Sequence, residues 1–239
     1  MNIQKYTLSE KEKFDNLLNN KTEISKIEKY FYKKTEKYLK FIKWIPWLKM
    51  IWIGNSISMN SASKNSDIDL LIVTEKNRMW LVRILVTLIF QILWVRKNNK
   101  NHAGRFCLSF FCEIDWLDFS NFTLEKDPYL YFWILYFKPI LDYWNTYDLF
   151  IEKNKSWASF SEYENNLKEN KKYIKYTKKI KKDYFNFLWN ILNTLFKKIF
   201  SPKTLKHYNN IWKPYGVVIS DDILKFHNWD IRKKIALKI

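Results

Sequence analysis

The sequence has few cysteines, glycines and prolines, and each shortage excludes a class of protein. Its only two cysteines, Cys107 and Cys112, exclude a disulfide framework and a zinc site built from cysteine pairs. They lie five residues apart in an expected strand, so alternation predicts opposite faces for them. Three glycines and five prolines in 239 residues exclude collagen-like and low-complexity chains. Residues 1–20 mix acidic, basic and polar side chains, so we expect no signal peptide and a cytoplasmic protein.

What is abundant is apolar and basic. Hydrophobic residues make up 47% and aromatic residues 19% of the chain, which indicates a folded globular protein. The net charge of +18 comes from 42 Lys and Arg against 24 Asp and Glu. A surface that binds a polyanion such as RNA is one explanation of this charge. The dominance of lysine over arginine also fits the codon usage of an AT-rich genome, so both explanations stay open.

The pattern of apolar residues predicts an α/β (α+β) fold with a small mixed sheet. Three short apolar, β-branched runs are typical of strands, and longer periodic segments are typical of helices. We expect N-terminal helices in residues 1–44, a sheet-containing core in 45–125 and a helical C-terminal region in 126–239. The expected strands are 48–53, 67–73 and 105–112. The expected helices are 8–20, 23–43, 79–95, 129–141, 147–154 and 168–200, the last as one helix or two.

Two apolar segments raise the question of a membrane. Residues 79–95 are almost continuously apolar, but the segment is short for a membrane span and contains Arg83. A helix that connects two strands is the preferred interpretation. The second segment has an apolar stripe, which predicts a core contact but also fits a basic helix lying on an anionic membrane. Its members are Tyr184, Phe185, Leu188, Ile191, Leu192, Leu195, Phe196 and Ile199. Membrane association is not expected, and it would require an apolar face that the fold leaves uncovered.

The most informative motif joins a turn to a pair of acids. Gly54-Asn55-Ser56 follows one expected strand, and Asp67 and Asp69 lie at the start of the next. Residues i and i+2 of a strand point to the same side, so the two carboxylates lie close together and repel each other unless a cation compensates them. Hard divalent cations prefer such oxygen ligands, and the turn offers N–H groups to a phosphate. The motif therefore predicts a site for a nucleoside triphosphate with Mg²⁺ or Mn²⁺, although a turn glycine before a strand with acids at its start is the plain structural alternative.

This ordered set resembles the nucleotidyltransferase superfamily of the DNA polymerase beta type. Looser similarity extends to Arg105–Phe111, Phe137–Asp142 and the tail with His227, Asp230 and Arg232. These segments look like an uncharacterised bacterial subgroup that contains a nucleotidyltransferase domain. The resemblance implies an α/β fold with a helical C-terminal part and metal-dependent transfer of a nucleoside monophosphate to a hydroxyl acceptor.

By position, the resemblance assigns Gly54 and Ser56 to phosphate binding, with Asn55 between them, and Asp67 and Asp69 to the metal. The third carboxylate of the superfamily lies within the next strand, where this chain has Ser109. Strand alternation predicts Glu113 on the same face, which makes it the expected third acid, with Asp115 as the next nearest. The remaining expectations concern basic and tail residues: Lys64 and Arg105 as triphosphate ligands, and His227, Asp230 and Arg232 as a structural clasp or part of the cleft.

Two functions remain open on this basis. The chain is either an active nucleotidyltransferase acting on RNA, a small molecule or a protein hydroxyl, or a non-catalytic module that binds nucleotide or RNA. Glu113 discriminates them: a position within metal reach of Asp67 and Asp69 favours the enzyme, and a side chain turned to solvent favours the binding module. If RNA is the partner, we expect lysines between Lys168 and Lys206 to contact phosphates and three tyrosines to stack on bases, with affinity falling steeply as salt rises. These tyrosines are Tyr173, Tyr176 and Tyr184.

Overall fold

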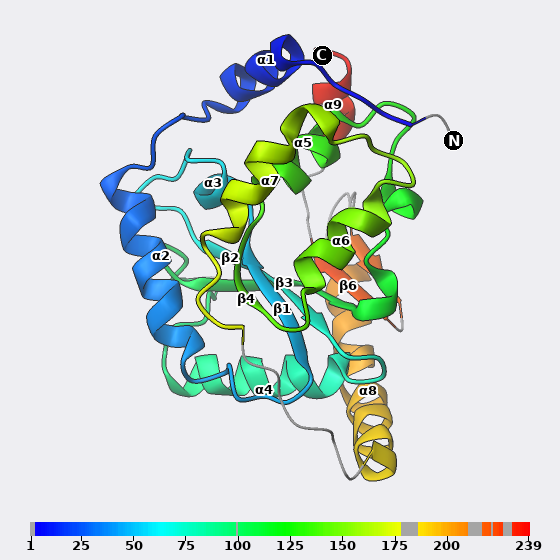
Figure 1. Ribbon diagram of the computed structural model, residues 1–239. Helices are drawn as coiled ribbons and strands as arrows, with labels where there is room; N and C mark the ends of the chain where they lie inside the picture. The colour runs from blue at the N-terminus through cyan, green and yellow to red at the C-terminus, as the bar shows by residue number, and fades with distance from the viewer. Residues whose placement is uncertain (1–2, 99, 178–185, 210–216, 221, 227–230) are drawn as a thin grey trace.

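The computed structural model describes residues 3–98, 100–177, 186–209, 217–220, 222–226 and 231–239 (Figure 1). Over these residues a mixed six-stranded sheet has α-helices on both of its faces, so the predicted α+β class is confirmed. Its strands are β1 (Leu48–Ile53), β2 (Ile68–Thr74), β3 (Phe106–Glu113), β4 (Lys138–Asp142), β5 (Val217–Ile219) and β6 (Ile223–Phe226). The α-helices are α1 (Leu8–Leu18), α2 (Lys26–Leu39), α3 (Asn55–Ser58), α4 (Met79–Ile92), α5 (Pro128–Tyr136), α6 (Thr146–Asn154), α7 (Glu164–Lys171), α8 (Asn186–Asn209) and α9 (Arg232–Ala236). Short 3-10 turns are η1 (Ile114–Trp116), η2 (Ser120–Phe122) and η3 (Ser161–Tyr163).

The strands follow the order β4-β1-β2-β3-β6-β5. Among the six strands that the structure describes, only β2 and β3 are parallel neighbours, and α4 makes the crossover between them, as a parallel pair requires. The interpretation of this apolar segment as a connecting helix is therefore confirmed. Among the residues that the structure describes, no helix combines the length and apolarity needed to cross a membrane.

The sheet extends beyond the three expected strands, because β4, β5 and β6 all come from the C-terminal region. The prediction of helix through residue 141 was wrong for β4. Helix α5 is apolar on all sides and buried, and β4 continues the same apolar run after Phe137. Periodicity does not separate a fully buried helix from a buried strand, so the run conceals the boundary.

The two faces of the sheet carry separate hydrophobic cores. In β2, Leu71 and Val73 pack with α5 and α6 on one face, and Leu70 and Ile72 pack with α2 and α4 on the other. Burial on both sides explains why β2 reads as a continuous apolar run. Asp69 belongs by alternation to the face of Leu71 and Val73, which we call the α5 face.

Helix α2 also fixes the loop between α3 and β2. Ser25 and Glu28 form a capping box at its N-terminus. The second oxygen of the buried Glu28 carboxylate accepts a hydrogen bond of 2.9 Å from the backbone N–H of Ala62. The loop that leads to the acid pair is thereby tied to the N-terminal helices.

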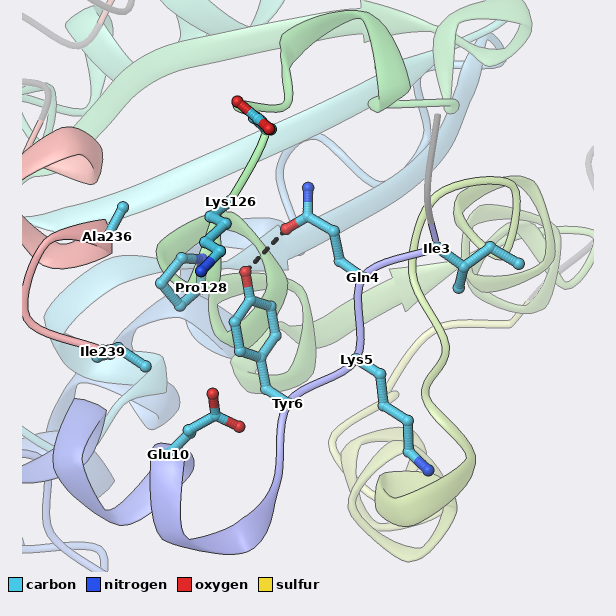
Figure 2. A pocket seen from close by; sticks show the side chains of 10 residues that line it. Ile3, Gln4, Lys5, Tyr6, Glu10, Lys126, Pro128, Ala236 and Ile239 are labelled. Atoms are coloured by element: carbon cyan, nitrogen blue, oxygen red, sulfur yellow. Dashed lines mark hydrogen bonds between the residues drawn. The ribbon is translucent and has the colours of Figure 1, made fainter.

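A cavity of about 650 Å³ lies between the N-terminal segment and the chain end at Ile239 (Figure 2). Gln4 and Tyr6 line it and are joined by a hydrogen bond of 2.9 Å from the Tyr6 hydroxyl. Gln4 also accepts a hydrogen bond of 2.8 Å from the N–H of Asp127 at the start of α5. None of the residues that line the cavity belongs to the predicted turn or acid pair, so it plays no part in the site described below.

Candidate metal and nucleotide site

The turn that follows β1 brings Gly54 close to the side chain of Leu71. A Cβ added to Gly54 would lie 2.8 Å from Cδ1 of Leu71, which is closer than side-chain atoms pack. The N–H of Gly54 donates to the carbonyl of Asp69 over 3.2 Å, so the turn is joined to β2. Asn55 begins α3 with a positive φ of 54°, a conformation that asparagine adopts more readily than most residues.

The side chain of Asn55 links this turn to the acid pair. Trp133 of α5 donates its indole N–H to Oδ1 of Asn55 over 2.9 Å. Because an indole only donates, the amide oxygen faces Trp133 and the amide nitrogen faces Asp69. Nδ2 of Asn55 then donates to Oδ2 of Asp69 over 2.7 Å. Asn55 therefore orients one of the two acids.

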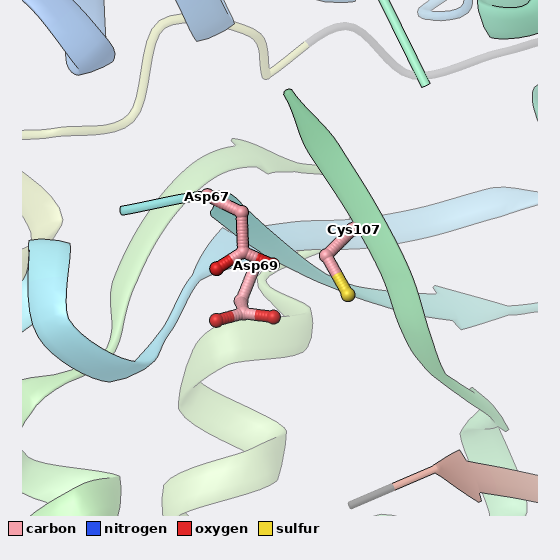
Figure 3. Close-up of side chains that lie close together, drawn as sticks. All are labelled: Asp67, Asp69 and Cys107. Atoms are coloured by element: carbon pink, nitrogen blue, oxygen red, sulfur yellow. The ribbon is translucent and has the colours of Figure 1, made fainter. Parts of the chain in front are cut away.

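The structure brings Asp67 and Asp69 together, and it adds a thiol beside them (Figure 3). Asp67 lies just before β2, Asp69 lies within it, and Cys107 is the residue of β3 paired with Asp69. One carboxylate oxygen from each acid and the Cys107 sulfur all lie within 4.8 Å of one another. The predicted geometry, with both carboxylates on one side and beside the turn, is confirmed.

Burial and the nearby charge of Asp67 make the ionised form of Asp69 unfavourable. Burial, together with the neighbouring charge of Asp67, raises the pKa of Asp69 from its ordinary 3.8 to about 6, although the hydrogen bond from Asn55 opposes this rise. Burial and the charge of Asp69 raise the pKa of the Cys107 thiol well above its ordinary range, so at neutral pH it is protonated. The site thus offers carboxylate oxygens and a neutral sulfur.

Lys97 supplies the positive charge next to these groups, and the sequence analysis did not identify it. Its Nζ lies 2.6 Å from Oδ2 of Asp67. Burial alone would lower the pKa of Lys97, but the hydrogen bond and charge of Asp67 outweigh it and raise the pKa. The backbone N–H of Lys97 donates to the carbonyl of Phe106 over 2.9 Å, which carries the chain after α4 back to the start of β3. This return depends on tertiary structure, so no local pattern indicates it.

We expect Lys97→Met to raise the affinity of the acid pair for Mn²⁺ severalfold in the absence of nucleotide. The ammonium group occupies Asp67, and a cation must displace it or share the carboxylate. Isothermal titration with Mn²⁺ measures the effect. Lys76→Met is the matched control, because Lys76 forms a similar ion pair of 2.8 Å with Asp115. Equal affinities of the Lys97→Met variant and the unmodified protein would show that the lysine does not compete with the cation.

The prediction that Glu113 completes the acid set was wrong. The register of β2 with β3 passes from Asp69–Cys107 to Leu71–Phe110, so β3 contains one extra residue, a β-bulge. Beyond the bulge the alternation is shifted: Phe110 and Cys112 pack on the α5 face, and Phe111 packs on the other. The same shift places Cys107 and Cys112 on one face rather than on opposite faces.

Glu113 has a structural role at the far end of β3. Its carboxylate is buried and accepts hydrogen bonds from the backbone N–H groups of Asn77, Arg78 and Met79 at 2.8, 3.2 and 3.3 Å. These groups form the N-terminus of α4, so Glu113 caps this helix from a neighbouring strand. Burial raises the pKa of Glu113, and the three backbone hydrogen bonds oppose the rise. Asp115 lies beyond it and pairs with Lys76.

The other predicted ligands lie at varied places around the turn. Ser56 is half-buried, one residue beyond Asn55, and Lys64 is exposed in the loop before Asp67. Arg105 precedes β3, but its guanidinium donates to the carbonyl of Trp94 after α4. The side chain of Arg105 is thus engaged with the end of a helix, whereas its carbonyl accepts a hydrogen bond of 2.8 Å from Ile68 at the start of β2.

The tail residue Arg232 forms a clasp. Its guanidinium lies 3.3 Å from the buried carboxylate of Asp127, which caps α5, and it also donates to the carbonyl of Phe122. The structural interpretation of Arg232 is therefore confirmed. His227 and Asp230 lie outside the described residues.

Comparison with known proteins adds no assignment to this geometry. No family model matches the chain, no curated protein matches its sequence, and no solved structure matches it.

Proposed function

We propose that this chain is a metal-dependent nucleotidyltransferase, which moves a nucleoside monophosphate from a triphosphate to a hydroxyl acceptor. The observation that carries the proposal is the juxtaposition at one end of β1 and β2. There the Asp67 and Asp69 carboxylates lie beside a Gly-Asn-Ser turn, and a hydrogen bond from Asn55 to Asp69 fixes one to the other. A turn and two acids so arranged provide for a triphosphate and its cation together.

The residues present fit Mg²⁺ or Mn²⁺ with phosphate oxygens as additional ligands. Mg²⁺ in nucleotide enzymes is commonly held by one or two carboxylates plus substrate phosphates and water. A cation bound there would supply positive charge at the reacting phosphorus and would lower the pKa of the acceptor hydroxyl. Asp67 and Asp69 would hold the cation, and Lys97, once released from Asp67, would be free to pair with a phosphate oxygen. Asn55 keeps the Asp69 carboxylate in a fixed rotamer.

A second candidate is a non-catalytic nucleotide-binding module, and a specific observation favours it. Glu113 lies at the opposite end of β3, and the residue paired with Asp69 is a cysteine with a raised thiol pKa. Two acids suffice to bind a nucleotide with its cation. The enzyme and the module therefore share the binding site and differ in whether the nucleotide is turned over.

RNA as acceptor or partner gains no support from the predicted stacking residues. Tyr173 packs against Tyr32 with ring centroids 4.9 Å apart, and the ammonium of Lys138 lies over its ring. Tyr176 donates its hydroxyl to the carbonyl of Glu36 over 3.1 Å, and Lys43 lies 4.7 Å from its ring centroid. Tyr184 lies outside the described residues. Both described rings are occupied within the fold, so any RNA contact rests on the lysines and is strongly salt-dependent.

We expect transfer of label from an α-labelled triphosphate to RNA, protein or a small hydroxyl compound in the presence of Mg²⁺ or Mn²⁺. Each of the four triphosphates is incubated with total RNA, total protein or a metabolite extract, and labelled products are separated by class. A γ-labelled triphosphate in parallel distinguishes nucleotidyl transfer from phosphoryl transfer. Equilibrium binding of a non-hydrolysable triphosphate, measured separately, identifies the module that binds without transfer.

The test variant for this experiment is Asp67→Asn, and Asp115→Asn is its matched control. Asp115 is an exposed acid in η1, just beyond the end of β3 that lies away from the site, and it pairs with Lys76. Its replacement should therefore leave binding and transfer unchanged. Transfer that survives Asp67→Asn would come from a contaminating enzyme or from another site. The absence of both metal-dependent binding and transfer would overturn the two candidates together.

A further inference from the structure

Helix α8 has apolar side chains on two sides, and the rest of the fold covers only one of them. Its inner face docks on α4 and the sheet. Arg78 at the start of α4 donates to the side chains of Asn186 and Asn190, and Asn193 accepts a hydrogen bond of 3.1 Å from the N–H of Leu81. Leu192, Phe196 and Phe200 pack against the core on this face. These contacts fix the orientation of the helix and hence the direction of its other face.

The outer face of α8 presents a continuous aliphatic stripe. Leu188, Ile191, Leu195 and Ile199 recur at helical spacing, and 47% to 50% of each residue's surface is exposed. Phe187, at 79% exposed, extends the stripe towards the N-terminus of the helix. The stripe that the sequence predicts as core is therefore divided: Leu192 and Phe196 are packed, whereas Leu188, Ile191, Leu195 and Ile199 face outward. Tyr184 and Phe185 lie outside the described residues. A row of exposed aliphatic side chains on one helix indicates an interaction surface.

Charge restricts what can cover this stripe. Residues 186–209 contain no Asp or Glu and four lysines: Lys197, Lys198, Lys203 and Lys206. Lys198 is seven residues after Ile191 and Lys206 is seven after Ile199, so these two exposed lysines lie on the side of the stripe. A second copy of this chain would bring together two such helices on proteins of net charge +18. Aliphatic side chains neither stack on bases nor form hydrogen bonds with them, so RNA does not account for the stripe.

We propose that α8 is a docking surface for an anionic lipid membrane, on which it lies parallel to the surface. The aliphatic stripe enters the boundary between headgroups and acyl chains, while the lysines extend towards anionic headgroups. Figure 1 shows α8 at the opposite end of the molecule from α3, which marks the candidate nucleotide site. Membrane contact through α8 therefore leaves the turn and the acid pair open to the solvent.

Vesicle sedimentation tests the proposal. Full-length protein is mixed with vesicles of phosphatidylcholine alone or of phosphatidylcholine with phosphatidylglycerol, at low and at physiological ionic strength. We expect binding to the anionic vesicles that weakens with salt. The double variant Ile191→Asn/Leu195→Asn should lower the partition coefficient about tenfold, because the half-exposed side chains lose their transfer into lipid. Circular dichroism and thermal unfolding verify that the variant is folded.

Two controls distinguish the contribution of the stripe to vesicle binding from that of exposed apolar side chains and positive charge elsewhere on the protein. Leu8→Asn/Leu237→Asn removes exposed aliphatic side chains elsewhere and should bind as the unmodified protein does. Lys198→Glu/Lys206→Glu should weaken binding more than Lys13→Glu/Lys153→Glu, which changes the net charge equally on α1 and α6. Equal binding to neutral vesicles, or equal loss in both charge variants, would overturn the proposal. The proposal would also be overturned if the protein did not bind the vesicles but formed a dimer or an RNA complex that depended on the stripe.

Discussion

Asp69→Asn is expected to abolish metal-dependent binding of a nucleoside triphosphate and, at the same time, to make the metal-free protein more stable. Binding is lost because the site retains only one carboxylate. Stability rises because ionised Asp69 is unfavourable in the fold: its pKa is about 6, against an ordinary value of 3.8. At pH 8 the substitution should raise the free energy of unfolding by on the order of 2 kcal/mol.

The pH dependence follows from the same shift. A group with a raised pKa in the folded state binds protons more tightly there, so the unmodified protein gains stability as the pH falls from above 6 towards 4. The asparagine variant lacks this gain, and the two stabilities should converge near pH 4. Urea unfolding with chelator at several pH values measures the difference. A variant that is less stable than the unmodified protein at pH 8 would contradict the assigned strain, whereas retained triphosphate binding would contradict the role in the metal site.

Glu113→Ala is expected to lower the free energy of unfolding by about 2–4 kcal/mol without altering the candidate nucleotide site. The substitution leaves the N–H groups of Asn77, Arg78 and Met79 without the carboxylate that accepts from them. These donors are at the buried start of α4, where a lost cap and unsatisfied N–H groups are costly. Chemical unfolding measures the loss, and triphosphate binding by the remaining folded protein should be unchanged.

Two companion substitutions define the meaning of this result. Glu113→Gln keeps one amide oxygen for the helix and should lose less than the alanine variant. Glu75→Ala removes an exposed carboxylate whose partner, Lys49, is 3.7 Å away, and should cost little. If Glu113→Ala unfolds at the same urea concentration as the unmodified protein, the cap contributes nothing. If it selectively loses nucleotide binding, the separation of Glu113 from the site is wrong.

The sequence predicts the site best where local geometry decides it. β1, β2 and β3 lie within one residue of their predicted bounds, because each is a short β-branched run between polar segments. The proximity of Asp67 to Asp69 follows from the i, i+2 spacing alone. The turn at Gly54 is equally local, and its hydrogen bond to Asp69 joins two strands that are neighbours in sequence and in space.

The remainder depends on contacts that no local pattern specifies. Ser109 and Phe110 look like ordinary members of a strand, so the bulge and the changed face of Glu113 are not visible in the sequence. Lys97 comes to Asp67 through the return of the chain to β3. β4 was concealed by its continuity with the apolar helix α5, and its pairing with β1 arises from tertiary packing.

The bulge in β3 has a consequence for how this protein can vary. The extra residue changes which side chains face α5, so the residues before it and the residues after it contact different parts of the fold. The first part can change its donor atom beside Asp69 without altering the anchor of α4. The last part can gain or lose the hydrogen bonds between Glu113 and the start of α4 without altering the chemistry beside Asp69. The two ends of β3 therefore serve separate purposes, and substitutions at one end need not affect the other.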